Sequence, residues 1–197
     1  NGICCKPVLS FDERGHQRND MIYYVLGSDE NGDKPEGFFP TVESFIGESG
    51  SFIAPEAVAY KKKGCKAGTS FDGKEAVGAF AFPEVTLESG AQKEYIVVSG
   101  MAESRNEVTR TAEAFHTKAQ TDEAFAKTKT YWNQLVNISF ETGDPKEDNY
   151  LKWICFQPIL RRIYGCSFLP YHDYGRGGRG WRDLWQDCLS LLLMNPQ

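Results

Sequence analysis

The chain has 197 residues, enough to bury a core in one large domain or in parts of two. Its 41% hydrophobic and 25% charged residues are ordinary for a soluble globular protein, and no apolar run reaches the ~20 residues that a membrane helix requires. The formal net charge of -5 argues against nucleic acid as the main partner, because phosphate backbones need a basic surface.

The first hundred residues have the pattern of short β-strands. Residues 21–26 are apolar, aromatic or β-branched, and Asn31-Gly32-Asp33 after them marks a turn. Two further strands are expected on either side of residues 88–91. Their apolar residues are Phe80, Phe82, Val85, Leu87, Tyr95, Ile96, Val97 and Val98. Because no helical period interrupts these strands, we expect an antiparallel β-sandwich over 1–103.

Two helices are predicted next, within a region over 104–143. Ser104 followed by Glu107 fits a capping box, which predicts a helix to about Lys118. A second helix is expected to begin at Thr121 and to carry Phe125, Trp132, Leu135 and Val136.

Two more helices are predicted in the last region, 144–197. Asp144 as N-cap and Pro145 at the first helical position begin a helix that extends to about Tyr164, with a kink at Pro158. The final helix begins at about Trp181. Strands followed by helices indicate an α+β, multi-domain organisation.

The final helix has one narrow polar stripe, formed by Asp183, Gln186, Asp187 and Ser190. The rest of its surface is apolar, so we expect it to be buried on most sides and its stripe to face a cavity or a partner. The inner layer of a double-layered helical barrel around a ligand has this geometry. The alternative is a core helix whose acids pair with Arg176, Arg179 or Arg182.

Cysteine usage, one lysine run and the chain ends give further expectations. The six cysteines have neither CxxC nor Cys/His spacing, so we expect no metal site and reduced thiols in a cytoplasmic protein. The lysines at 61–63 are expected in a solvated loop. The chain begins at Asn1 within a strand pattern and stops just after an apolar helix, so we expect a fragment.

The glycine-rich segment 171–187 has the residues that a sugar site uses. It formally contains GxGxxG, but helices flank it instead of a βαβ unit, so we reject dinucleotide binding. A pyranose needs Asp to accept and Arg to donate hydrogen bonds, an aromatic face, and glycine for close approach. The segment supplies Arg176, Arg179, Trp181, Arg182, Asp183, Trp185 and Asp187. It therefore predicts a polyol-binding loop.

The same segment resembles the Arg-x-x-Gly-x-Gly-Phe-Arg-Asp-x-x-Gln-Asp segment of glycoside hydrolase family 94, the inverting phosphorylases that include cellobiose and chitobiose phosphorylases. In register are Gly180, Arg182, Asp183, Gln186 and Asp187, whereas Arg179 replaces a commonly aromatic residue and Trp181 replaces Phe. A stretch in 43–58 is similar to the family's sandwich signature. It consists of Glu43-Ser44-Phe45-Ile46-Gly47, Gly50-Ser51 and Pro55-Glu56-Ala57-Val58. Trp132, Leu135, Leu151, Trp153 and Gln157 resemble the linker helix and the first barrel helix.

The resemblance implies a β-sandwich, a helical linker and the start of an (α/α) six-hairpin barrel. The family residues that match Arg176 and Asp183 bind the glycosyl unit at subsite −1, and we expect Arg182 and Trp181 beside them to bind substrate. The general acid and the phosphate-binding residues belong to later segments, so no catalytic residue is expected in this chain. No cofactor is implied, and inorganic phosphate is the co-substrate.

The expected function is therefore part of an inverting glycoside phosphorylase that cleaves β-linked gluco-oligosaccharides to give a sugar 1-phosphate. Its expected partners are the oligosaccharide and the remainder of the barrel, and a homodimer is left open. Two alternatives stay open as well, an inverting glycoside hydrolase of glucoamylase-like build and a non-catalytic carbohydrate-binding module.

Overall fold

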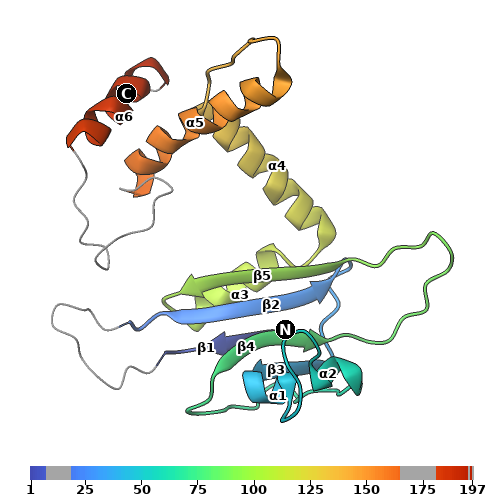
Figure 1. Cartoon of the computed structure of the whole chain (residues 1–197). Helices are drawn as coiled ribbons and strands as arrows, with labels where there is room; N and C mark the ends of the chain where they lie inside the picture. Colours follow the sequence, from blue (N-terminus) through green and yellow to red (C-terminus); the bar gives the residue numbers. More distant parts are fainter. Residues whose placement is uncertain (8–18, 165–180, 195, 197) are drawn as a thin grey trace. The chain divides into compact units, whose positions relative to one another are not determined.

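The computed structural model describes residues 1–7, 19–164, 181–194 and 196, with side chains described for all of these but 161–164, 181–184, 186 and 187. The chain forms two compact units, Asn1–Glu123 and Ala124–Gln197 (Figure 1). This division lies inside the predicted linker, and the predicted boundaries at 103 and 143 stay predictions. Across the ranges just given, every helix is too short or too polar to cross a membrane.

Two antiparallel sheets make up the centre of the first unit. One sheet has the order β1-β2-β5, and the other pairs β3 with β4. The strands are β1 (Gly2–Cys5), β2 (Ile22–Asp29), β3 (Gly37–Thr41), β4 (Ala76–Ala81) and β5 (Tyr95–Ala102). The predicted antiparallel sandwich is therefore confirmed.

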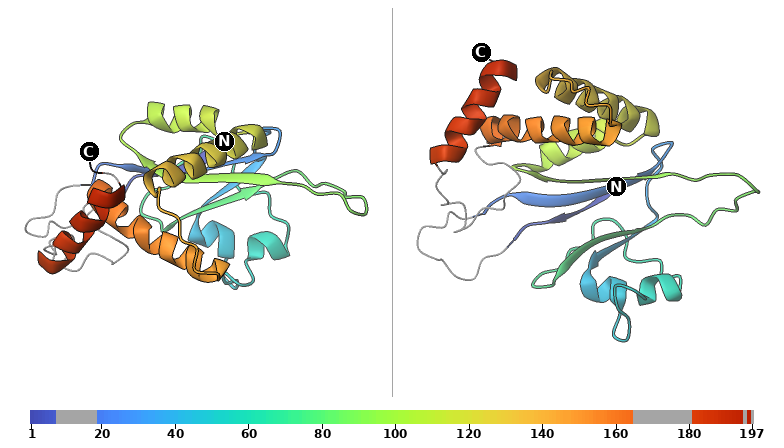
Figure 2. Two further views of the ribbon diagram at one scale, coloured as in Figure 1. Left: turned by 90° about the horizontal axis from the view of Figure 1, so that it is seen from above. Right: turned by 45° about the horizontal axis from the view of Figure 1, so that its top comes forward.

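Alternating side chains of β2 fill two separate interfaces. Tyr24 and Leu26 face α3 (Arg105–Ala114) and form a core with Ala102 and Val108. On the other face, Gly27 lies against the ring of Phe80, where an added Cβ would come within 2.8 Å of the ring. Figure 2 shows the resulting layers, with α3 on one side of the larger sheet and the β3–β4 sheet on the other.

One predicted strand is shorter than expected. β4 ends at Ala81, so the expectation that Phe82, Val85 and Leu87 continue it is wrong. Pro83 follows two residues later, and proline has no N–H to donate to a ladder. The strand predicted after residues 88–91 is confirmed as β5.

Two short helices, α1 (Val42–Ile46) and α2 (Glu56–Ala59), interrupt the strands, contrary to the expectation of a purely β region. Thr41 begins α1 with a complete capping box, because its hydroxyl accepts from the Ser44 N–H and the Ser44 hydroxyl accepts from the Thr41 N–H. With five and four residues, these helices are too short to give a helical period in the sequence.

The predicted helix starts are close to the observed ones. Ser104 caps α3, but Glu107 accepts a hydrogen bond from the N–H of Glu103 and not of Ser104, so the predicted capping box is only half formed. α3 ends at Ala114 and α4 (Lys118–Leu135) begins three residues before the predicted Thr121. The Gln120 side chain causes this early start, because it accepts hydrogen bonds from the N–H groups of residues 116 and 117.

The second unit contains α5 (Pro145–Tyr164) and α6 (Trp181–Met194), as predicted. Asp144 caps α5 by accepting from the Lys146 N–H at 2.9 Å. Pro158 lies inside α5, and the kink at this residue stays a prediction. The core of the unit contains Val136, Ile159 and Met194.

The described outer surface of α6 is apolar and exposed. The side chains of Leu189, Leu192 and Leu193 are 64%, 63% and 80% exposed. The sequence predicts that this helix needs partners on most sides, and the described residues leave these leucines uncovered.

Candidate functional site

The sequence-predicted sugar residues lie at and beyond the edge of what the structure describes. Arg176 is outside the described residues, as are Arg179 and Cys166. Trp181, Arg182 and Asp183 begin α6, but their side chains are outside the description. Their substrate-binding roles stay predictions.

A pocket of about 520 Å³, lined mostly by polar and charged residues, lies beside α1 in the first unit. Both charge signs, two serines and one aromatic ring are present in its wall. The lining residues are Thr41, Glu43, Ser44, Gly47, Glu48, Ser49, Glu56, Lys62, Phe71 and Lys74. We name it the α1 pocket.

Glu56 is the most firmly held charged group of the α1 pocket. Its carboxylate accepts a hydrogen bond from the Lys62 ammonium at 2.8 Å and another from the Ser49 N–H at 3.0 Å. The Lys62 hydrogen bond, and then that from Ser49, hold the pKa of Glu56 below its ordinary value. Glu56 is therefore an ionised, oriented carboxylate at neutral pH.

Two glycines permit the tight loop that brings Glu56 into this position. Gly47 has a φ of 75°, and a Cβ at this residue would collide with the Glu56 carboxylate. A Cβ at Gly50 would collide with the carbonyl oxygen of Ile46. The wall therefore depends on glycine at both positions.

On the other side of the α1 pocket, Lys74 pairs with Glu43 at 2.6 Å. Both side chains are more than half exposed, and Lys74 lowers the pKa of the Glu43 carboxyl. Glu48 and Phe71 make no hydrogen bond, ion pair or ring contact with another described residue. These two side chains are free to contact a ligand.

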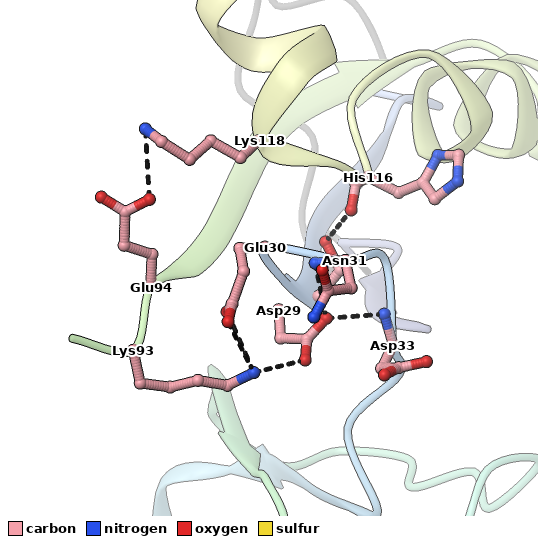
Figure 3. Close-up of polar contacts among 9 residues, drawn as sticks. Asp29, Glu30, Asn31, Asp33, Lys93, Glu94, His116 and Lys118 are labelled. Carbon is pink, nitrogen blue, oxygen red and sulfur yellow. Dashed lines mark hydrogen bonds and ion pairs between the residues drawn. The ribbon is translucent and has the colours of Figure 1, made fainter. Parts of the chain in front are cut away.

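A second polar cluster in the same unit is closed. The Lys93 ammonium lies between the carboxylates of Asp29 and Glu30, at 2.6 and 3.0 Å (Figure 3). Asp29 also accepts from the N–H groups of Asn31 and Asp33 at 3.0 and 2.8 Å. The hydrogen bond from Lys93 is the main cause of the lowered pKa of Asp29, and the two carboxylates raise the pKa of Lys93.

This Asp29–Glu30–Lys93 cluster adjoins the junction between α3 and α4. The Ser28 hydroxyl donates to the His116 carbonyl at 2.8 Å, and the Lys118 N–H donates to the Glu30 carbonyl at 3.0 Å. The Lys118 ammonium pairs with Glu94 at 3.1 Å (Figure 3). These neighbouring contacts hold the start of α4 on the sandwich, while the cluster itself ties the end of β2 to the segment before β5.

Comparison with known proteins identifies the domain that contains the α1 pocket and the Asp29–Glu30–Lys93 cluster. The family model of the glycosyl hydrolase 94 supersandwich domain matches residues 9–118, more than half of the chain. The chain belongs to glycosyl hydrolase family 94. The resemblance seen in the sequence is thus confirmed at the level of the family.

Two curated relatives place the glycosyl hydrolase 94 match in longer proteins. N,N'-diacetylchitobiose phosphorylase of Vibrio furnissii is 24% identical over 194 residues, which cover 96% of this chain and 23% of that protein. Cyclic beta-(1,2)-glucan synthase NdvB of Rhizobium meliloti (strain 1021) is 24% identical over 164 residues, which cover 81% of this chain and 6% of that protein. The chain therefore spans less than a quarter of either relative.

The α1 pocket is built largely from the segment that resembles the glycosyl hydrolase 94 sandwich signature. Gly47, Gly50 and Glu56 belong to that segment. Sequence patterns alone did not indicate the α1 pocket, although the signature segment forms much of its wall. Lys93 had no signal at all, because its partner Asp29 is 64 residues away.

Proposed function

We propose that this chain is part of an inverting glycoside phosphorylase that cleaves β-linked gluco-oligosaccharides with inorganic phosphate. The observation that carries the proposal is the family match over residues 9–118. It is supported by the similarity to a chitobiose phosphorylase over 96% of this chain. The product is a sugar 1-phosphate, formed in the cytoplasm, where the free thiols of the described cysteines would stay reduced.

In this proposal the chain binds the sugar, and residues outside it perform the chemistry. Arg176 and Asp183 bind the glycosyl unit at subsite −1, with Arg182 and Trp181 beside them. An acid outside the chain protonates the glycosidic oxygen while phosphate attacks the anomeric carbon from the opposite face. Phosphate takes the place of the base-activated water of an inverting hydrolase.

We further propose that 104–143 is the helical linker and that 144–197 begins an (α/α) barrel. The exposed leucines of α6 support the second assignment, because Leu189, Leu192 and Leu193 need an apolar partner. In the proposed barrel, later helices cover them. The remainder of the barrel is thus a proposed partner of this chain.

A second candidate function is glucan binding without phosphorolysis. The similarity to a cyclic beta-(1,2)-glucan synthase favours it, because the name of that protein describes glucan synthesis and not phosphorolysis. In that case the chain is a non-catalytic carbohydrate-binding module. An inverting hydrolase is the remaining alternative.

The dependence of cleavage on phosphate distinguishes these candidates. The longest natural polypeptide that contains this chain is incubated with cellobiose, sophorose or N,N'-diacetylchitobiose, with and without inorganic phosphate. A phosphorylase forms sugar 1-phosphate only with phosphate, a hydrolase releases free sugar without it, and a binding module does neither. We expect no sugar 1-phosphate from the 197-residue chain alone.

The Asp183→Asn variant tests the proposed sugar site in the same polypeptide. It removes the charge and one acceptor, and a hydrogen bond to a charged group contributes roughly 1.5–3 kcal/mol. We expect kcat/KM to fall about ten- to a hundredfold while Tm is retained. Normal kinetics with a lowered Tm would instead make Asp183 a structural partner of an arginine.

A further inference from the structure

We propose that the α1 pocket is a second carbohydrate site, which binds neutral gluco-oligosaccharides on the sandwich. This inference rests on the proposed function for its substrate class. The α1 pocket lies in the first unit, and all the predicted glycosyl-binding residues lie in the second. Its volume of about 520 Å³ is in the range of small-molecule sites.

The charge of the α1 pocket favours a neutral ligand over an anion. Its wall has three carboxylates, Glu43, Glu48 and Glu56, against two ammonium groups. Each ammonium already pairs with a carboxylate, at 2.8 Å for Lys62 and 2.6 Å for Lys74. An incoming phosphate would meet an excess of negative charge, whereas a sugar hydroxyl meets donors and acceptors without repulsion.

The α1 pocket keeps hydrogen-bonding capacity for such hydroxyls. An ammonium group has three donors, and the described contacts use one of those on Lys62 and one of those on Lys74. The Glu48 carboxylate accepts no hydrogen bond from a described residue. A polyol, whose hydroxyls both donate and accept, can use both kinds of group.

Phe71 supplies the apolar face that a pyranose requires. The side chain is 46% exposed, lines the α1 pocket and has no ring partner among the described residues. In the same pocket, Glu56 and the glycine-dependent loop 47–50 are held by hydrogen bonds and by close packing before a ligand enters. Such preorganisation lowers the cost of binding.

Titration of the 197-residue chain with cellotetraose, followed by amide chemical shifts, tests the proposal. We expect saturable shifts at residues 43–74, with weak affinity because the α1 pocket is open. Phe71→Ala is expected to weaken binding about fivefold to tenfold. The matched control is Phe52→Ala, which removes an exposed ring outside the α1 pocket and should leave the affinity unchanged.

Three further measurements complete the test. Glu48→Ala should also weaken binding, which keeps the proposal testable should Phe71→Ala fold poorly. Asp183→Asn should not change the shifts at 43–74, because it belongs to the other proposed sugar site. Inorganic phosphate alone should produce no saturable shift there.

Equal affinity of wild type, Phe71→Ala and Glu48→Ala would overturn the proposal, and so would saturation by phosphate or the absence of saturable shifts with cellotetraose. These outcomes are independent of the phosphorolysis assay. Phosphorolysis without binding at 43–74 would overturn the second site alone, and binding without phosphorolysis would overturn the proposed activity alone.

Discussion

The α1 pocket and the Asp29–Glu30–Lys93 cluster use the same residue types in the same unit, yet they differ in what they leave open. In the cluster, Lys93 bonds to two carboxylates, and Asp29 accepts two more backbone hydrogen bonds. In the α1 pocket, Lys74 pairs with one carboxylate while Glu48 and Phe71 have no described partner. A largely buried network in which one cation is shared by two carboxylates stabilises a fold, whereas an exposed network with unpaired groups retains capacity for a ligand.

Removing the cation of the closed cluster should have the largest effect on stability. Lys93→Met leaves the carboxylates of Asp29 and Glu30 close together without a counterion, and the Asp29 side chain is only 9% exposed. We expect Tm to fall by on the order of 5–10 °C in thermal unfolding of the chain. A Tm within one degree of wild type would mean that the cluster does not hold the fold, and its contrast with the α1 pocket would be lost.

A methyl group on Gly47 should have the next largest effect and should act on both stability and binding. Gly47→Ala forces a positive φ on alanine and drives its Cβ into the Glu56 carboxylate. We expect a loss of roughly 1–2 kcal/mol in the free energy of unfolding, measured by urea denaturation. Gly73→Ala is the matched control, because Gly73 also has a positive φ but its Cβ would meet no atom. The proposed role of Glu56 requires that Gly47→Ala weaken cellotetraose binding more than Gly73→Ala does.

Acid should weaken the closed cluster through its carboxylates. Lys93 lowers the folded-state pKa of Asp29 and of Glu30, so their stabilisation is fully present above the unfolded carboxyl pKa of about 4 and is lost as pH falls through the lowered values. We expect Tm of the wild type to fall more steeply between about pH 5 and pH 3 than Tm of Lys93→Met. Parallel curves for the two proteins would contradict this assignment.

Removing the cation of the exposed pair should have the smallest effect. Lys74 and Glu43 are 51% and 65% exposed, so solvent screens their attraction. We expect Lys74→Met to change Tm by no more than about 2 °C. The variant should nevertheless weaken cellotetraose binding, because it removes donors from the α1 pocket. A large drop in Tm would place Lys74 with Lys93 as a structural residue.

Elements that local chemistry determines could be predicted from the sequence. Asp144 and Pro145 predicted the start of α5, and Ser104 predicted that of α3, because a capping residue acts on N–H groups two or three positions away. The run of apolar residues before the turn at 31–33 predicted β2 for a similar reason. These signals lie within a few residues of the structure that they specify.

The polar clusters could not be predicted, because their partners are distant in sequence. Lys62 lies in an exposed loop, as the sequence predicts, yet its ammonium also helps to orient Glu56, which the sequence does not indicate. Glu43 and Lys74 are 31 residues apart, and only the fold brings them together. Family resemblance identified the segment that builds much of the α1 pocket, but not Lys62 and Lys74, the charged lining residues that lie outside this segment.

The long sequence separation of these contacts also determines when the first unit can form during synthesis. β2 pairs with β5, which begins at Tyr95, and the Ser28–His116 hydrogen bond spans 88 residues. β1 is already synthesised when β2 appears, but the edge of β2 that pairs with β5 must stay unpaired while more than sixty residues emerge from the ribosome. Sheet pairings of this separation form slowly and leave unpaired strand edges exposed to aggregation. A nascent chain arrested before β5 should bind chaperones, and one extended past Lys118 should release them.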